Sequence, residues 1–218
     1  MRDVPRMGAY PFIIMKIFLM LIMMGCALYC AAQDKYDHVW LFGRYPNNPS
    51  NNSGGTMVDF NYSTPQVSYS FLADNFGFLE ISMISNKEGK LQCYTNGCSI
   101  VNHNHLVMEN GDSLNFGQIY NSYCGSGIGY PTEQGSIFLP LPGSEHVYYL
   151  FHIGIDSDQW SKFLNYTIID MTKNGGDGKV VSKNQLLFST LHFGQQITAN
   201  RHANGRDWWL VIPHSIAF

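Results

Sequence analysis

The sequence has little charge, no long apolar run beyond its N-terminus and no amphipathic helical periodicity. Charged residues make up 13% of its 218 residues, and the formal net charge is −3. This balance provides no basic face for nucleic acid or for an anionic membrane surface. Hydrophobic residues make up 45% of the chain, which is enough to bury a core, so disorder is not expected. Aromatic residues reach 14%, and Gly, Asn and Ser separate short apolar runs, a composition typical of a turn-rich β protein.

The N-terminus has the pattern of a secretory signal peptide. Arg2, Arg6 and Lys16 precede the uncharged stretch "IFLMLIMMGCALYCAA", which ends in small residues and is followed by the polar "QDKYD". The pattern predicts that residues 1–33 are a signal peptide and that the protein is secreted or held at the cell surface.

Two further readings of the N-terminus stay open. Translation from Met15 would give a more compact signal. A transmembrane anchor is the other reading, but the apolar stretch falls short of the roughly 20 residues that span a bilayer. Removal of residues 1–33 takes away three positive charges and one negative charge, which leaves −5 on residues 34–218. No later apolar run reaches spanning length, so we expect no membrane span in the exported part.

Export changes how the five cysteines are read. Cys26 and Cys30 leave with the signal peptide, and Cys93, Cys98 and Cys124 remain. In an oxidising compartment, three cysteines divide naturally into one disulfide and one unpaired thiol.

Short β segments separated by turn residues fill the rest of the chain. Asn-Gly and Gly-Gly pairs supply the positive-φ residues that tight hairpins need, so consecutive strands are expected to pair antiparallel as a meander. Two strands that close on a glycine turn recur along the chain, as stacked blades would require. A β-sandwich also uses hairpins and is the alternative architecture. The expected turns contain "TNG", "ENGD", "LPGSE", "KNGGDG" and "ANGRD".

Over residues 37–214, the order of these motifs resembles a known family. The series runs "VWLFGR", "VDFN", "EGKLQCYTNGCSIVNHNHLVMENGDSL", "GSIFLPLPGSEHVYYLFH", "LNYTIIDMTKNGGDGKVVSKNQLLF" and "ITANRHANGRDWWLV". It is similar to the N-terminal β-propeller-like region of large exported surface proteins of Bacteroidetes.

The resemblance implies that residues 34–218 form a WD40-like propeller module. Members of the family often end in a gliding-motility-associated or type IX secretion sorting domain. This sequence stops at "WWLVIPHSIAF", inside an expected strand. The expectation is therefore a truncated, incomplete propeller of some four blades.

The stretch "LQCYTNGCSI" predicts the cysteine pairing. A two-residue turn at Asn96-Gly97 would place Cys93 opposite Ile100 and diagonal to Cys98, about 7 Å away by typical sheet spacing. A disulfide needs Cβ atoms about 3.8 Å apart, so the pair Cys98–Cys124 is favoured over Cys93–Cys98. This disulfide would close a loop of about 26 residues and contribute roughly 3 kcal/mol on the chain-entropy model.

His103 and His105 are the candidate metal ligands. Residues at i and i+2 of a strand share a face, so the two imidazoles could chelate an ion together with Cys93 and Cys98. The alternative is that they are exposed turn histidines, because "VNHNHL" has the composition of a turn. The turn reading is favoured, and no metal or other cofactor is predicted.

No local arrangement of nucleophile and base is visible in the sequence. The glycine-rich stretches "CGSGIG" and "NGGDG" do not precede a helix, so they do not predict a phosphate site. The chain is therefore expected to be a non-catalytic surface or secreted module that binds a protein or a glycan. The alternative is a fragment of a propeller-based glycan-active hydrolase, in which carboxylates from several blades would converge.

Overall fold

In the computed structural model the chain divides into two units, residues 1–34 and 35–218. In the first unit Met15, Lys16, Phe18 and Met20 are helical and exposed, and the rest of the predicted signal peptide lies outside the described residues. Within the described residues, no helix has both the length and the apolar character needed to cross a membrane. The described residues are 15–16, 18, 20, 34–42, 55–70, 79–126, 128–158, 161–189 and 194–214.

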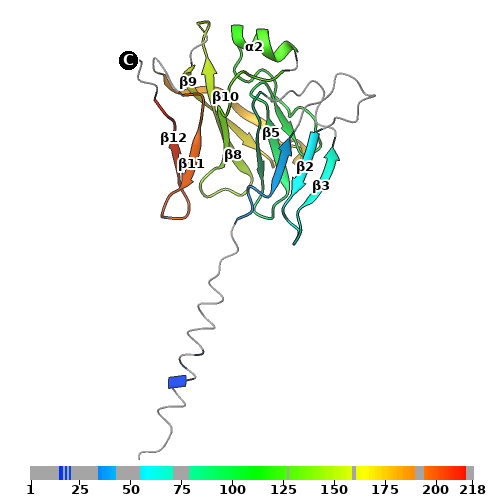
Figure 1. Ribbon diagram of the computed structural model, residues 1–218. Coiled ribbons are helices and arrows are strands. Elements are labelled where there is room, and N and C mark those ends of the chain that lie inside the picture. Colours follow the sequence, from blue (N-terminus) through cyan, green and yellow to red (C-terminus); the bar gives the residue numbers. More distant parts are fainter. Residues whose placement is uncertain are drawn as a thin grey trace, which may run out of the picture. The chain divides into compact units, whose positions relative to one another are not determined.

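The second unit is built almost entirely of antiparallel strands, which confirms the prediction of an all-β fold (Figure 1). In the part of the chain that the structure describes, the strands form four sheets, with the orders β1-β2-β3, β4-β5-β6, β7-β8-β9-β10 and β11-β12. The strands are β1 (Val39–Phe42), β2 (Gly55–Asp59), β3 (Gln66–Ser70), β4 (Ser82–Ser85), β5 (Leu91–Thr95), β6 (Ile100–Asn102), β7 (Ser136–Pro140), β8 (Val147–Ile155), β9 (Ser161–Asp170), β10 (Lys179–Ser189), β11 (Thr198–Arg201) and β12 (Trp208–Val211).

Within each sheet, neighbouring strands follow one another in the sequence, as a meander requires. Three of the predicted turns are observed between β7 and β8, β9 and β10, and β11 and β12. Gly175 and Gly205 lie in the last two of these turns with φ values of 67° and 71°. Side chains with a Cβ rarely adopt this backbone region, which is why glycine marks these turns in the sequence.

The predicted register of β5 and β6 is wrong. The strands pair Cys93 with Asn102 and Thr95 with Ile100, so the loop spans four residues, 96–99, rather than the expected two. The reason is local side-chain bonding. The Asn96 Oδ1 atom accepts the backbone N–H of Cys98 at 3.1 Å and that of Ser99 at 3.4 Å, and the Thr95 hydroxyl donates to the Ser99 carbonyl at 2.7 Å.

Two elements have weak sequence signals and were not expected. Strand β3 has the sequence QVSYS, and Val67 and Tyr69 are mostly exposed, so no buried apolar alternation marks it. Helix α2 (Gln118–Tyr123) has six residues and is followed by the 3-10 turn η1 (Cys124–Ser126). Six residues are too few to show helical periodicity.

The core lies between successive sheets. The first strand of each sheet is near the first strand of the next: β1 contacts β4, and β4 contacts β7. At the start of β11, the Ile197 N–H donates to the Gln134 carbonyl just before β7, at 2.9 Å. The largest buried cluster joins the second and third sheets through Ile84, Cys93, Ile100, Met108, Leu114, Phe138, Tyr148, Leu150, Ile169, Met171 and Val180.

The first sheet has one buried and one exposed face. Val39 and Leu41 point toward the second sheet and are buried. Trp40 lies opposite Val58, which lies opposite Val67, so these side chains share the other face. That face is apolar and solvent-exposed.

Candidate ligand-binding cleft

An open cleft lies between the β7–β8 turn and the β11–β12 hairpin. It consists of two hollows of about 250 Å³ and 200 Å³ that share Pro140, Pro142 and Trp208. The larger hollow is also lined by Tyr36, Lys87, Leu141, Gly143, Ser144, Glu145, Arg201, Gly205 and Arg206.

Two hydrogen-bonded turns fix the walls of the cleft. In the β7–β8 turn, the Leu141 N–H donates to the Val147 carbonyl at 2.9 Å, and the Ser144 hydroxyl oxygen accepts the Val147 N–H at 3.1 Å. In the β11–β12 turn, the Asn204 Oδ1 atom accepts the N–H groups of Arg206 and Asp207, both at 3.0 Å. Because hydrogen bonds close these turns, the backbone of both cleft walls is held in place before a ligand arrives.

Trp208 lines both hollows. It is the first residue of β12 and pairs with Arg201 at the end of β11, so both side chains lie on the same face of the hairpin. The Arg201 guanidinium lies 5.7 Å from the centre of the Trp208 ring, within cation–π distance. The larger hollow therefore has a cation against an aromatic wall.

Four charged groups of the cleft form two ion pairs, Lys87–Glu145 and Arg206–Asp207. Lys87 Nζ is 2.6 Å from Glu145 Oε1. The Arg206 guanidinium donates to both carboxylate oxygens of Asp207, at 2.8 and 3.1 Å. The bonds from Arg206, together with one from the Asn204 amide, lower the pKa of Asp207 to about 2. The bond from Lys87 lowers the pKa of Glu145. Both carboxyl groups are therefore ionised at neutral pH.

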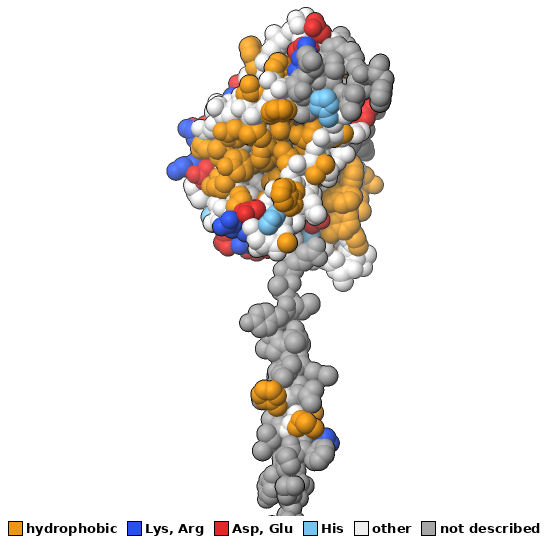
Figure 2. All heavy atoms as spheres, turned by 90° about the vertical axis from the view of Figure 1, so that its left-hand side faces the viewer, with side chains coloured by type: hydrophobic (Ala, Val, Ile, Leu, Met, Phe, Trp, Pro, Cys, Tyr) orange, Lys and Arg blue, Asp and Glu red, His pale blue; other side chains and the backbone are white. Residues whose placement is uncertain are grey.

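The lining of the smaller hollow is apolar apart from Asp207. Leu139 and Tyr149 lie opposite each other on β7 and β8, and Leu210 faces them from β12. The Tyr149 ring packs against Phe151 and Tyr166, with centroids 5.5 and 5.9 Å apart. Hydrophobic side chains gather on this side of the molecule, where β11 and β12 lie (Figure 2). The cleft thus combines a charged hollow with an aromatic one.

The two histidines proposed as metal ligands lie in the turn after β6. His103 is exposed, and the His105 Nδ1 atom is 3.0 Å from the Tyr94 hydroxyl. His105 has a positive φ of 62°, which is turn geometry rather than strand geometry. The described residues contain no group of three or more His, Cys, Asp or Glu side chains arranged to hold a metal ion.

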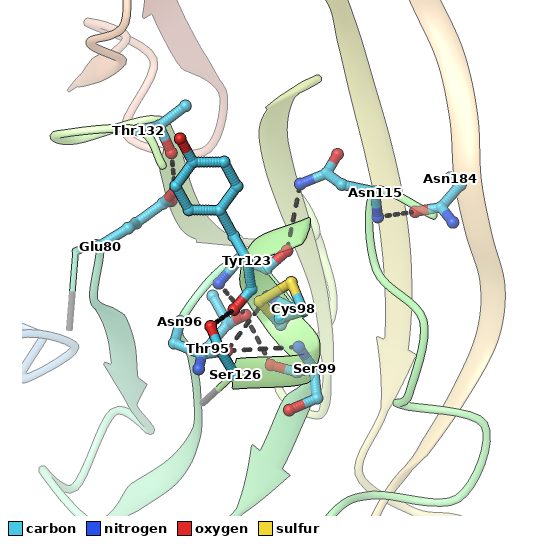
Figure 3. Close-up of a disulfide and its surroundings, with 12 residues drawn as sticks. Glu80, Thr95, Asn96, Cys98, Ser99, Asn115, Tyr123, Ser126, Thr132 and Asn184 are labelled. Atoms are coloured by element: carbon cyan, nitrogen blue, oxygen red, sulfur yellow. Dashed lines mark hydrogen bonds between the residues drawn. A yellow bond between two sulfur atoms is a disulfide. The ribbon is translucent and has the colours of Figure 1, made fainter. Parts of the chain in front are cut away.

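Cys98 and Cys124, the pair favoured by the sequence, are joined by a disulfide (Figure 3). Their Cα atoms are 5.6 Å apart, and the bond ties the β5–β6 loop to the end of helix α2. Cys93 is unpaired and buried in the core, and burial raises the pKa of its thiol. A buried thiol with a raised pKa is a packing residue rather than a nucleophile.

His152 of β8 is the centre of a buried polar network. Its Nδ1 atom is 2.7 Å from the Asn115 Oδ1 atom, and its Nε2 atom is 3.1 Å from the Thr167 hydroxyl. Asn184 completes the network: its backbone N–H donates to the Thr167 oxygen, and its Oδ1 atom accepts the Asn115 N–H (Figure 3). The Asn115 amide donates to the Gly97 carbonyl, so its oxygen faces the imidazole. His152 is therefore neutral with its proton on Nδ1, and burial lowers its pKa to about 3.

Glu80 is buried with fewer partners. The Thr132 hydroxyl donates to its Oε2 atom (Figure 3), whereas its Oε1 atom and the nearby buried Ser136 hydroxyl have no hydrogen-bond partner among the described residues. Burial raises the pKa of Glu80 to about 7, against the smaller lowering effects of the neighbouring Ser136 and Thr132 hydroxyl groups. The side chain is 3% exposed, so a ligand in solvent does not reach it.

Sequence reasoning assigned the "RHANGRDWW" stretch to a turn and did not identify a cleft. One signal was available. Residues 34–218 contain three arginines, and two of them, Arg201 and Arg206, flank this turn beside two tryptophans. Comparison of the chain with protein-family models, curated proteins and solved structures finds no match.

Proposed function

We propose that this chain is an exported, non-catalytic module with a propeller-like arrangement of sheets, and that it binds a glycan partner through the Trp208 cleft. The observation that carries the proposal is the cleft itself, in which aromatic rings and ionised side chains line the same open surface. Protein recognition sites for small polar ligands combine these two kinds of side chain.

The contacts between first strands support the propeller-like arrangement. In a propeller, each blade is a meander whose strands follow the sequence, and the blades stand side by side around an axis. The sequence order within each sheet and the contacts from β1 to β4 and from β4 to β7 are consistent with such blades. The resemblance to Bacteroidetes surface proteins leads to the same proposal.

Two observations support export. Residues 1–33 have the signal-peptide pattern, and the Cys98–Cys124 disulfide belongs to a chemistry that oxidising compartments favour. Surface display or secretion would bring the cleft into contact with extracellular polysaccharides.

Both carboxyl groups of the cleft are ionised at neutral pH, and this favours binding over hydrolysis. Glycosidases generally need one carboxyl group with a raised pKa as the general acid. Glu145 and Asp207 line the cleft, and the pKa of each is lowered. Glu80 has a raised pKa but is buried away from solvent.

A glycan array with the full chain tests the proposal. We expect binding that Trp208→Ala abolishes and that Trp209→Ala preserves, since Trp209 is 60% exposed and alternates with Trp208 onto the opposite face of β12. Circular dichroism confirms that both variants fold. Equal binding by both variants would contradict the assignment of the cleft, and release of reducing ends from a bound glycan would establish hydrolysis instead.

A further inference from the structure

Resting on the proposed function, we infer that the cleft recognises an anionic sugar, a pyranose ring that carries a carboxylate or a sulfate group. The aromatic side chains would pack on the apolar face of the ring, and the arginines would bind the anionic substituent. This goes further than glycan binding in general, because it excludes neutral polysaccharides as the preferred ligands.

The distribution of cations supports an anionic ligand. Lys87, Arg201 and Arg206 line the cleft together with two carboxylates, Glu145 and Asp207, so the local formal charge is +1. Residues 34–218 as a whole carry −5. The described lining of the cleft is therefore more positive than the protein as a whole, and a positive lining attracts anions.

The identity and placement of the cations indicate carboxylate or sulfate. Arginine presents a planar fork of donors that matches two oxygens of an oxyanion at once. The Trp208 ring supports the Arg201 guanidinium, and Asp207 orients that of Arg206. The charges of Arg206 and Asp207 offset each other, so this pair contributes donors and orientation to anion binding rather than net charge.

The shape of the cleft favours a sugar over a peptide. Tyr36 and Trp208 both border the larger hollow, and its volume of about 250 Å³ lies below the range of about 300 to 1,000 Å³ typical of drug-sized ligands. A hollow of this size suits a single sugar unit. Rigid aromatic rings provide apolar contact area at little entropic cost.

Calorimetric titration of the full chain tests the inference. The ligands are a tetramer of galacturonate, the same tetramer as its neutral methyl ester, a sulfated galactose tetramer and a tetraglutamate peptide. We expect an anionic tetramer to bind about ten-fold or more tightly than the ester, because hydrogen bonds to charged groups are stronger than neutral ones. Comparison of the galacturonate and sulfated tetramers decides which anion the cleft prefers.

Two variants and one control locate the effect. Arg201→Gln and Arg206→Gln should each weaken binding of the preferred anionic tetramer about ten-fold and weaken binding of the ester much less. Lys173→Gln is the control, because it removes an exposed cation that pairs with Asp170 in the β9–β10 turn, outside the cleft lining. A rise in salt from about 50 to about 200 mM should weaken only the anionic complex, and this measurement needs no variant.

The outcomes separate the inference from the proposed function. Equal affinity for the ester and the anionic tetramers overturns the inference and leaves glycan binding in place. Tighter binding of tetraglutamate than of any sugar also overturns it and identifies a protein partner. Absence of binding to every sugar, including those of the glycan array, overturns both.

Discussion

His152 and Glu80 are both buried, but the protein accommodates them differently. The His152 ring has a partner on each nitrogen, Asn115 from the loop before α2 and Thr167 from β9. Both partners also bond to Asn184 of β10. Glu80 has one carboxyl oxygen bonded and the other without a partner among the described residues. A buried polar network stabilises a fold when it is complete, whereas a buried group without partners carries a desolvation cost. The His152 network therefore helps to specify the fold, whereas Glu80 lowers the stability of the fold at neutral pH.

The largest expected effect comes from breaking the complete network. His152→Phe removes both ring hydrogen bonds and leaves the Asn115 oxygen and the Thr167 hydroxyl buried with one partner fewer, so we expect a loss of about 4 kcal/mol in the free energy of unfolding. Urea denaturation measures it, with the exposed His146→Phe as the control. A loss below about 1 kcal/mol would show that the network adds little to stability.

The second prediction concerns pH and the incomplete site. Burial raises the pKa of Glu80 from 4.5 to about 7, so the folded protein binds this proton more tightly than the unfolded chain does. Its contribution to stability is therefore full below pH 4.5 and is lost as the pH rises to about 7. Glu80→Gln keeps the shape without the charge, and we expect the variant to be more stable than the native protein by about 3 kcal/mol at pH 8 and similar to it at pH 4.

The native protein and the Glu80→Gln variant both contain His152, so the effect of His152 on the pH dependence of stability cancels when the two are compared. Its lowered pKa makes stability fall as the pH drops from 6.5 toward 3, and this slope is present in both proteins. Parallel unfolding curves for the native protein and Glu80→Gln between pH 4 and pH 8 would contradict the raised pKa.

The smallest expected effects on stability come from replacing one threonine at each site. The Thr167 hydroxyl bonds to His152 and to the Asn184 N–H, whereas the Thr132 hydroxyl bonds to Glu80. Replacement by valine keeps the shape, so we expect a loss of about 2 kcal/mol for Thr167→Val and about 1 kcal/mol for Thr132→Val at pH 5. Thermal unfolding at that pH measures both. A larger loss of stability for Thr132→Val than for Thr167→Val would contradict the difference between the His152 network and the Glu80 site.

Much of the fold could be predicted because its signals are local. Glycine turns and short apolar runs mark β7 to β12, and the backbone at Gly175 and Gly205 has the positive φ that their residue type indicated. The β5–β6 register was missed because side-chain bonds from Thr95 and Asn96 lengthen the loop. Strand β3 was missed because its exposed face carries no buried alternation.

The candidate site was harder to predict because its parts are distant in the sequence. Lys87 and Glu145 meet only after the second and third sheets pack, and Arg201 joins them from β11. The cysteine pairing was accessible because three cysteines leave few combinations. The His152 network was not, because its partners Asn115 and Asn184 come from separate segments.

The strand order within the sheets determines how quickly different parts of the fold can form. Each strand pairs with a strand next to it in the sequence, so hairpin formation closes short loops, a process on the order of 1–10 μs. Contacts between β1, β4 and β7 join residues far apart along the chain and have high contact order, which slows folding. We therefore expect folding to divide into a fast stage within sheets and a slower docking stage between them.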